Sequence, residues 1–399
     1  MTAARAAASE RHCFAAALSE HPVTADAVAE VVGEVLEGLV PPGSGSPPEA
    51  PDLALLFVTP PHLGNIGDAV KAVRAALSPR TLLGCAAISV VGGGREVERG
   101  PGMSLWAGYT GALTAFHLTV SATPDGQTFT GWPDEIPNDA SALLLLTDPF
   151  TFPVDQLLAR LAEDRPGLPV VGGLASAAQG PGENRLVING EVVSQGAVGA
   201  FLGPEVQVST VVSQGCRPVG NPFVVTKADR NIVFELAGRP ALERLQEVAE
   251  GLSEEDRELM SELVQLGRVI DEGRAEFGPG DFLIRSVVGA DPDTGALAVG
   301  DLVDVGSTTQ FQVRDAGSAD ADLRHLVDGK SADGALLFTC NGRGVRLFGA
   351  ANHDASVVSE SLAGAPVAGM FCAGELGPIG GHNFVHGFTA SVVLLSVQQ

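Results

Sequence analysis

The apolar residues of the chain fall into short runs, and three of these runs resemble one another. They read ALLFVTP, ALLLLTDP and ALLFTCN and begin at Ala54, Ala142 and Ala335. A continuous apolar run of this length is typical of a buried strand in a parallel sheet. A helix-compatible stretch and a second apolar run follow each of them, which together predict a right-handed βαβ unit. A glycine marks the second run in each case, at Gly84, Gly172 and Gly369.

The spacing within these three segments indicates an internal triplication into copies one, two and three. The distance from the first alanine to the glycine is 30, 30 and 34 residues, and three ordered matches favour repetition over chance. A Gly-Pro pair follows the glycine after 16, 8 and 8 residues, which predicts an eight-residue insertion around VVGGGREV in copy one. Each copy then returns to strand, and Asn189-Gly190 in copy two is a favoured hairpin turn. The predicted fold is therefore α/β, with mixed β-sheets built from a repeated βαβ-plus-hairpin unit.

The rest of the chain is less repetitive. Residues 24–38 place apolar side chains at helical spacing, with Thr24 as the predicted N-cap. Residues 240–276 are predicted to be helical, and the capping box that begins at Ser253 predicts the start of a second helix there. Residues 282–306 predict a β-hairpin that turns at DPDTG.

Composition and charge restrict the partners. The chain has 399 residues, 45% of them hydrophobic, with 24 basic and 48 acidic side chains and a net charge of −24. The apolar content excludes wholesale disorder. An anionic surface repels nucleic-acid phosphates and acidic lipid headgroups, so we expect neither a nucleic-acid nor a membrane partner. No apolar stretch reaches the length of about 18 residues that a spanning helix needs, and Glu10 interrupts the N-terminal apolar run, so we expect a cytoplasmic protein.

The sequence favours neither a metal nor a cofactor. Its 5 cysteines are widely spaced without a C-x-x-C pair, which fits reduced thiols rather than a disulfide framework or a zinc site. The histidines show no ligand-like spacing. GGGREV (92–97) and GRGVRL (342–347) each lack the third glycine of a dinucleotide-binding loop, and no Walker motif is present. The glycines are better explained as turn and close-approach residues.

The densest group of polar residues lies in copy three, in CNGRG (340–344) and MFCAGELGPIGGHNFVHGF (370–388). Ligands bind at the carboxyl ends of strands in α/β sheets, so we expect a site for a small polar molecule here. The planar guanidinium of Arg343 suits a carboxylate and Glu375 suits an amine, a combination that fits an amino acid. The candidate ligand-binding residues are Asn341, Arg343, Arg346, Cys372, Glu375, Asn383, His386 and, from the turn GCRPVGNPF, Arg217.

A second hypothesis makes the same region an enzyme. Cys372 would be a thiol nucleophile for acyl transfer or hydrolysis, with Glu375 and His386 supplying the base and the orienting group. Simpler interpretations stand beside both hypotheses. Copy two has Ala175 at the position of Cys372, which favours a packing role for this cysteine. His386 fits an ordinary histidine of an alternating strand, and Arg343 and Arg346 fit solvated side chains. No spacing demands a catalytic group, so ligand binding is preferred.

Four longer segments carry a family resemblance. They are GCAAISVVGGGREVERGPGMSLWAG (84–108), PVVGGLASA (169–177), GCRPVGNPFVVTKADRNIVFELAGRPALE (215–243) and FCAGELGPIGGHNFVHGFTAS (371–391). With them the chain resembles the FIST family of small-ligand sensory domains, which have FIST N and FIST C parts. The resemblance implies an N-terminal segment over residues 1–25, a FIST N-like domain over 26–225 and a FIST C-like domain over 226–399.

The resemblance also implies a function. It implies intracellular sensing of small molecules, with amino acids as the proposed class, and it supplies no validated binding residues. The FIST-like parts fill the chain and leave no output segment, so we expect signalling through a separate partner protein. A third hypothesis is an assembly protein, in which the repeats present the interface of a homo-oligomer.

Overall fold

The computed structural model describes residues 13–40, 49–123, 126–278 and 280–397, which form two compact units. The larger unit consists of the described residues up to Val212, of Arg324–Val385 and of the described residues from Ala390 on. The smaller unit consists of Ser213–Leu323 and His386–Thr389. Copy three therefore folds in the same unit as copies one and two, although the smaller unit separates it from them along the chain.

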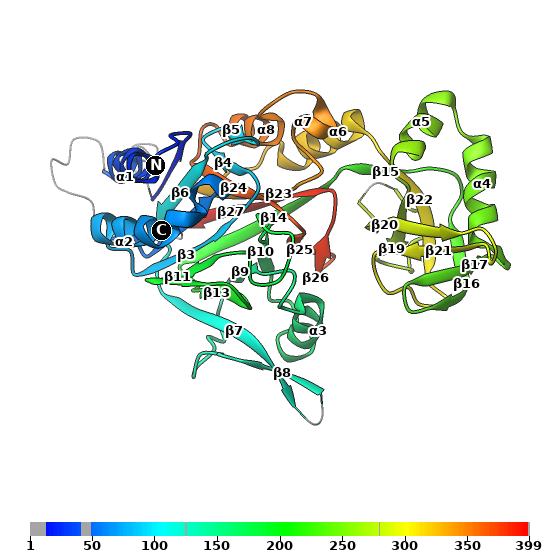
Figure 1. Ribbon diagram of the computed structural model, residues 1–399, viewed down its shortest axis with the longest axis horizontal. Coiled ribbons are helices and arrows are strands. Elements are labelled where there is room, and N and C mark those ends of the chain that lie inside the picture. Colours follow the sequence, from blue (N-terminus) through cyan, green and yellow to red (C-terminus); the bar gives the residue numbers. More distant parts are fainter. Residues whose placement is uncertain (1–12, 41–48, 124–125, 279, 398–399) are drawn as a thin grey trace, which may run out of the picture. The chain divides into compact units, whose positions relative to one another are not determined.

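Each copy forms the same series of elements: a strand, a helical segment, a parallel strand, a β-hairpin and a final antiparallel strand (Figure 1). Copy one comprises β2 (Leu53–Val58), η1 (Pro60–Asn65), α2 (Ile66–Leu77), β3 (Thr81–Ala86), β4 (Val90–Gly92), β5 (Arg95–Val97) and β6 (Met103–Gly108). Copy two comprises β9 (Ala142–Thr147), α3 (Val154–Asp164), β10 (Val170–Leu174), β11 (Leu186–Ile188), β12 (Glu191–Val193) and β13 (Ala197–Leu202). Copy three comprises β23 (Gly334–Cys340), α7 (Val345–Phe348), α8 (His353–Ser361), β24 (Val367–Cys372), β25 (Glu375–Ile379), β26 (His382–His386) and β27 (Thr389–Val397). The predicted repeat is confirmed.

Each copy builds the centre of one sheet. Its first strand pairs in parallel with its second strand and antiparallel with its final strand, as in β3–β2–β6, β10–β9–β13 and β24–β23–β27. A further strand joins each final strand: β1 (Phe14–Ser19) on β6, β7 (Leu113–Thr123) on β13 and β14 (Val206–Gln214) on β27. β8 (Gly126–Thr130) pairs with β7. The sheets are mixed, as predicted.

The hairpin of each copy extends the sheet of another copy. Hairpin β4–β5 of copy one pairs with β24 of copy three, β11–β12 of copy two pairs with β3 of copy one, and β25–β26 of copy three pairs with β10 of copy two. The exchange is cyclic, since each sheet gives one hairpin and receives one. Each copy therefore needs the hairpin of one other copy to complete its sheet, and the three dependences form a closed cycle.

These hairpins correct the alignment that the Gly-Pro pairs suggested. The prediction of an insertion around VVGGGREV is wrong, because this segment forms β4 and β5 and has a counterpart in both other copies. The Gly-Pro pairs lie after the hairpin in copy one, before it in copy two and inside β25 in copy three. The predicted hairpin of copy two is confirmed. The three hairpins turn at Gly93-Gly94, Asn189-Gly190 and Gly380-Gly381.

An apolar core lies between the three sheets. It combines Leu55 and Trp106 from the first sheet with Leu144 from the second and Phe338 and Met370 from the third. Helices cover the opposite faces: α1 (Thr24–Leu39) and α2 pack on the first sheet and α3 on the second (Figure 1). The central strands are therefore buried on both faces, which explains their continuous apolar runs.

The three repeat glycines face the first strand of their own copy at the same register. Gly84 lies opposite Leu56, Gly172 opposite Leu145 and Gly369 opposite Leu337. A Cβ atom at these glycines would lie 2.1, 2.0 and 1.8 Å, respectively, from the carbonyl oxygen of the facing leucine. The close approach of the two strands thus requires glycine in every copy.

The smaller unit is one antiparallel sheet with helices. Its elements are β15 (Cys216–Pro218), β16 (Phe223–Asp229), β17 (Ile232–Leu236), β18 (Arg239–Pro240), α4 (Ala241–Gly251), α5 (Glu254–Glu262), β19 (Gln265–Val269), β20 (Phe282–Asp291), β21 (Ala296–Val299) and β22 (Thr308–Arg314). α6 (Ala316–Val327) leads along the chain into copy three. No helix of the described segments is long and apolar enough to cross a membrane.

The local predictions for helix ends and turns have mixed outcomes. The hairpin β20–β21 and the cap at Ser253 are confirmed, since the Ser253 hydroxyl accepts a hydrogen bond from the backbone N–H of Asp256 at 3.1 Å. The helix predicted to residue 276 is wrong beyond Glu262, because the following residues pair as β19 with β20 and β22. Thr24 is not an N-cap; it is the first residue of α1, and its hydroxyl contacts Nδ1 of His62 at 3.0 Å.

The repeat glycines lead to a stability prediction. We expect Gly369→Ala to lower the free energy of unfolding by about 3 kcal/mol or more, because the new methyl group must push two paired strands apart. Gly67→Ala is the matched control, since a Cβ atom at this helical position meets nothing within 4 Å. Urea unfolding of both variants measures the difference. Equal stability of the two variants would contradict the close-approach explanation.

Candidate functional site

The polar residues of copy three gather where β23 ends. The chain turns back after this strand, and the backbone N–H of Arg343 donates to the carbonyl oxygen of Cys340 at 2.8 Å. The turn carries the Arg343 side chain inward, so that only 1% of it is exposed. An arginine buried to this degree needs a charged partner within the protein.

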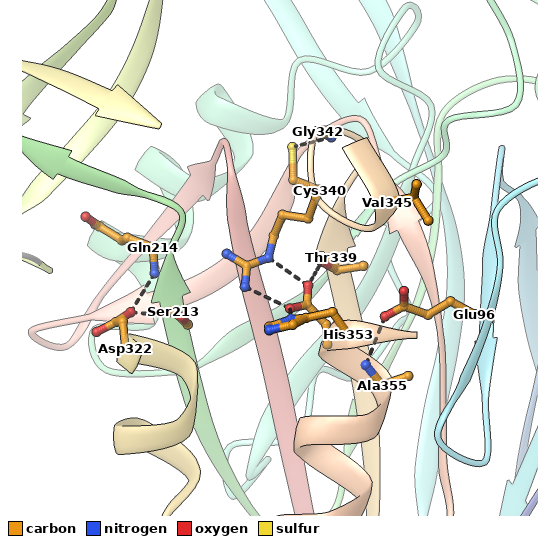
Figure 2. Close-up of polar contacts among 12 residues, drawn as sticks. Glu96, Ser213, Gln214, Asp322, Thr339, Cys340, Gly342, Val345, His353 and Ala355 are labelled. Atoms are coloured by element: carbon orange, nitrogen blue, oxygen red, sulfur yellow. Dashed lines mark hydrogen bonds and ion pairs between the residues drawn. The ribbon is translucent and has the colours of Figure 1, made fainter. Parts of the chain in front are cut away.

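The partner of Arg343 is Asp354, which lies in the first turn of α8 and is wholly buried. Nε donates to Oδ2 at 2.7 Å and Nη2 donates to Oδ1 at 2.8 Å, so the pair is bidentate. The hydroxyl of Thr339 donates to Oδ2 at 2.6 Å, and Nδ1 of His353 lies 3.0 Å from Oδ1 (Figure 2). Burial alone would raise the pKa of Asp354, but the guanidinium of Arg343 holds it well below its usual range.

An aromatic ring packs on this ion pair. The rings of Phe348, in α7, and His353 are stacked, with centroids 3.4 Å apart and planes inclined by 11°. The guanidinium carbon of Arg343 lies 5.2 Å from the centroid of the Phe348 ring. The guanidinium of Arg343 is therefore bound by the carboxylate of Asp354 and packs beside an aromatic ring. Together these two contacts fix the plane of the guanidinium.

One nitrogen of this guanidinium is not used. Nη1 of Arg343 is buried and has no hydrogen-bond partner among the described residues. Burial alone would lower the pKa of Arg343, yet the carboxylates of Asp354 and Glu375 raise it. Glu375 is itself wholly buried, at the start of β25. Among the described residues, this region thus contains an oriented cationic N–H donor that makes no hydrogen bond, near a buried carboxylate.

The hairpin of copy one and the residue that follows it supply two further acids, which are not among the residues predicted from the sequence. Oε1 of Glu96 accepts from the backbone N–H of Ala355 at 2.9 Å, in the first turn of α8 (Figure 2). The carboxylate of Glu98 accepts from the backbone N–H of Val345 at 2.9 and 3.1 Å, at the start of α7. Burial, together with the charge of Asp354, raises the pKa of Glu96 to about 7. A correct assignment of GGGREV as a hairpin would have pointed to these acids.

Several predicted site residues have structural partners instead. Oδ1 of Asn383 accepts from the backbone N–H of Val170 at 2.8 Å and its Nδ2 donates to the carbonyl of Leu168 at 2.8 Å, so both ends of the amide hold the start of β10. Arg217 forms ion pairs with Asp315, at 2.6 Å, and with Asp256 inside the smaller unit.

The remaining predicted residues differ in burial and location. Asn341 and Arg346 are exposed and flank Arg343 in the sequence. Cys372, the last residue of β24, is wholly buried in the core between the sheets. His386 is buried and belongs to the smaller unit.

The environment of Cys372 opposes the enzyme hypothesis. Burial raises the pKa of the Cys372 thiol well above its ordinary value, and the charge of Glu375 raises it further. A cysteine nucleophile reacts as the thiolate. A wholly buried thiol with a raised pKa is unsuited to acyl transfer, which needs a thiolate that a substrate can reach.

Two other kinds of ligand site, a metal site and a surface cavity, do not involve the predicted residues. The residues that the structure describes contain no group of three or more His, Cys, Asp or Glu side chains suited to a metal ion. One surface cavity of about 510 Å³ is lined by Thr114, Glu135, Ile136, Pro137 and Asn138. None of the eight predicted site residues lines this cavity.

Comparisons with known proteins identify the family. Residues 52–239 match the FIST N domain and residues 241–378 match the FIST C domain. The chain belongs to the FIST family. FIST domains are a family of sensory domains. Two similar relatives are uncharacterized proteins: Rv0628c of Mycobacterium tuberculosis, 45% identical over 351 residues, and Mb0898c of Mycobacterium bovis, 46% identical over 354 residues. The matches cover 86% and 87% of this chain and 91% of each relative.

The buried ion pair of this FIST protein leads to a second stability prediction. We expect Asp354→Leu and Arg343→Leu each to lower the free energy of unfolding by about 3–5 kcal/mol, because each leaves one charge buried without its partner. The double variant removes both charges and should lose much less than the sum of the two. Urea unfolding of the four proteins forms a double-mutant cycle. Strictly additive losses would mean that the two side chains do not depend on each other.

The buried carboxylate of Glu96 leads to a pH prediction for the FIST protein. Its pKa rises from 4.5 to about 7 on folding, so its stabilising contribution is complete below the unfolded pKa and is lost as the pH passes through the folded value. A rise from 4.5 to about 7 corresponds to about 3 kcal/mol.

Glu96→Gln removes this titration. We expect the stability of the natural protein relative to the variant to fall between pH 5 and pH 8, by up to about 3 kcal/mol. Urea unfolding at both pH values measures the change, and Glu163→Gln, at an exposed position of α3, is the matched control. A stability difference that is the same at both pH values would contradict a raised pKa.

Proposed function

We propose that this FIST protein is a cytoplasmic sensor that binds a small ligand with both a carboxylate and an amine, such as an amino acid or a related metabolite. The membership in a sensory-domain family supports the sensory role. The chemistry at the end of β23 supports the class of ligand. The signal would pass to a separate partner protein.

This proposal rests on one observation: Nη1 of Arg343 is buried and makes no hydrogen bond to any described residue. A buried donor without a hydrogen bond destabilises a protein by about 1–3 kcal/mol. A ligand carboxylate would remove this penalty through a charge-assisted hydrogen bond. Since Asp354 already holds Nε and Nη2, the guanidinium is oriented before a ligand arrives, and little further ordering is needed on binding.

Glu375 supports an amine at the other end of the ligand. Its carboxylate is wholly buried and close enough to Arg343 to raise the pKa of the guanidinium. A zwitterionic ligand would present its carboxylate to Arg343 and its ammonium group to Glu375. Such a ligand would place an opposite charge at both residues, which a purely anionic or cationic ligand does not achieve.

The surroundings of Arg343 supply a route to a signal. The ion pair joins the turn after β23 to α8, and the hairpin of copy one holds both α7 and α8 through Glu98 and Glu96. A ligand on Arg343 would therefore act on a contact between two copies.

The proposal predicts saturable binding that depends on Arg343 and Glu375. We expect at least one compound among the amino acids and related metabolites to raise the melting temperature, because a ligand at about 100 times its Kd adds about 2.7 kcal/mol of stability. For a chain of this size the shift is a few degrees. Calorimetric titration of the same compound gives the affinity.

Conservative variants test the site without leaving Asp354 unpaired. Arg343→Lys keeps the charge but removes the fork, and Glu375→Gln keeps the size but removes the charge, so each should weaken binding at least about tenfold. Arg160→Lys and Glu163→Gln, both exposed on α3, are the matched controls and should bind normally. A ligand that binds Arg343→Lys and Glu375→Gln as tightly as the natural protein would refute this site.

A further inference from the structure

Two cysteines lie side by side at the ends of neighbouring strands. Cys340 is the last residue of β23, Cys372 is the last residue of β24, and the two are paired in register in a parallel ladder. Neighbouring strands are about 4.8 Å apart, which lies within the Cα separation of about 4.4–6.8 Å that a disulfide spans. Residues paired in register project from the same face of a sheet. The two thiols therefore face the same side.

The other two copies do not carry this pair. The registers of β2–β3 and β9–β10 place Thr59 beside Ala87 and Asp148 beside Ala175 at the equivalent strand ends. Neither combination can form a disulfide. The pair of thiols is thus an addition of copy three rather than a property of the repeated fold.

The two thiols have different surroundings. Cys372 is wholly buried, and burial raises the pKa of its thiol. Cys340 is partly exposed, and its sulfur accepts a hydrogen bond from the backbone N–H of Gly342 at 3.4 Å (Figure 2). Cys340 is therefore the thiol that an oxidant in solution can reach, whereas Cys372 is shielded.

We propose that Cys340 and Cys372 are an oxidisable dithiol, which a hydroperoxide converts into a disulfide between β23 and β24. The Cys340 thiol loses its proton, and its sulfur attacks the terminal oxygen of the hydroperoxide. The O–O bond breaks, Cys340 becomes a sulfenic acid, and the alkoxide or hydroxide takes up the lost proton and leaves as an alcohol or water. The Cys372 sulfur then attacks the sulfenic sulfur and displaces hydroxide, which takes the thiol proton and leaves as water. Two thiols lose two electrons in total, and the hydroperoxide is reduced by two.

This modification would act on the candidate site without being part of ligand binding. Cys340 starts the turn that carries Arg343, and the hydrogen bond from Gly342 to its sulfur helps to form that turn. A bond from Cys340 to Cys372 ties the start of the turn to the neighbouring strand. The proposal stands on the strand register and is independent of whether the ligand is an amino acid.

Peptide mapping of the full chain tests the disulfide. The folded protein is exposed to hydrogen peroxide, the remaining thiols are alkylated, and trypsin is added without reductant. Cleavage after Lys330, Arg343 and Arg346 separates the two cysteines into peptides 331–343 and 347–399, each with a single cysteine. We expect a peroxide-dependent product that joins these two peptides, weighs two hydrogen atoms less than their sum and disappears on reduction.

Variants assign the two steps. In Cys372→Ser we expect the linked product to vanish and dimedone to trap a sulfenic acid at Cys340. In Cys340→Ser we expect Cys372 to stay reduced in the folded protein, because it is buried. Cys216→Ser, in the smaller unit, is the matched control and should form the linked product as the natural protein does. Circular dichroism confirms that each variant is folded.

Three results would overturn the proposal. The first is oxidation of the natural protein that leaves peptides 331–343 and 347–399 unlinked. The second is a link from either peptide to another cysteine or to a second molecule. The third is a linked product that forms only in urea, because the pairing would then not depend on the folded strands.

Discussion

The cyclic exchange of hairpins is the constraint on which the larger unit depends. A β-hairpin satisfies half of its backbone hydrogen bonds internally and needs a sheet edge for the rest. In this protein β3, β10 and β24 supply those edges, each to the hairpin of a different copy. The three copies must therefore assemble together, and copy three must return to copies one and two after the smaller unit has intervened. The apolar core between the sheets closes only when this assembly is complete.

The exchange also decides the composition of the candidate site. Because hairpin β4–β5 lies on the sheet of copy three, acids of copy one reach the helices α7 and α8, and Glu96 is buried beside Asp354. A buried ion pair such as Arg343–Asp354 is weak evidence for stability, since apolar residues of the same size can be as stable. Its effect here is positional: it fixes two nitrogens of the guanidinium and leaves Nη1 in a defined direction.

The sequence predicts the repeated part of this architecture well, because strand burial and close approach leave local signals. The apolar runs and the repeat glycines, such as Gly369, are examples. The destination of a hairpin leaves no such signal, since a two-residue turn determines how its own strands pair but not which edge they join. The Gly-Pro pairs suggested a false insertion for this reason, and Glu96 was missed with it. The partners of Arg343 and Asn383 were equally hidden, because they depend on where α8 and β10 lie in space.

Comparison of the three copies explains why copy three carries the candidate site. At the end of the first strand, the hydroxyl of Thr59 in copy one accepts from the backbone N–H of Gly102 at 2.7 Å, and Asp148 in copy two accepts from Asn184 at 2.8 Å and from Thr151 at 2.6 Å. Both copies thus close their strand end with strong hydrogen bonds of their own. Copy three has Cys340 at this position, and a thiol is a poor hydrogen-bonding group. Arg343 and Asp354 occupy the strand end instead, and a bidentate pair cannot use every donor of a guanidinium. Copy three therefore differs from the other two copies in two linked ways. Its strand end carries a thiol in place of a strong hydrogen-bonding group, and it carries an arginine N–H donor to which a ligand can bind.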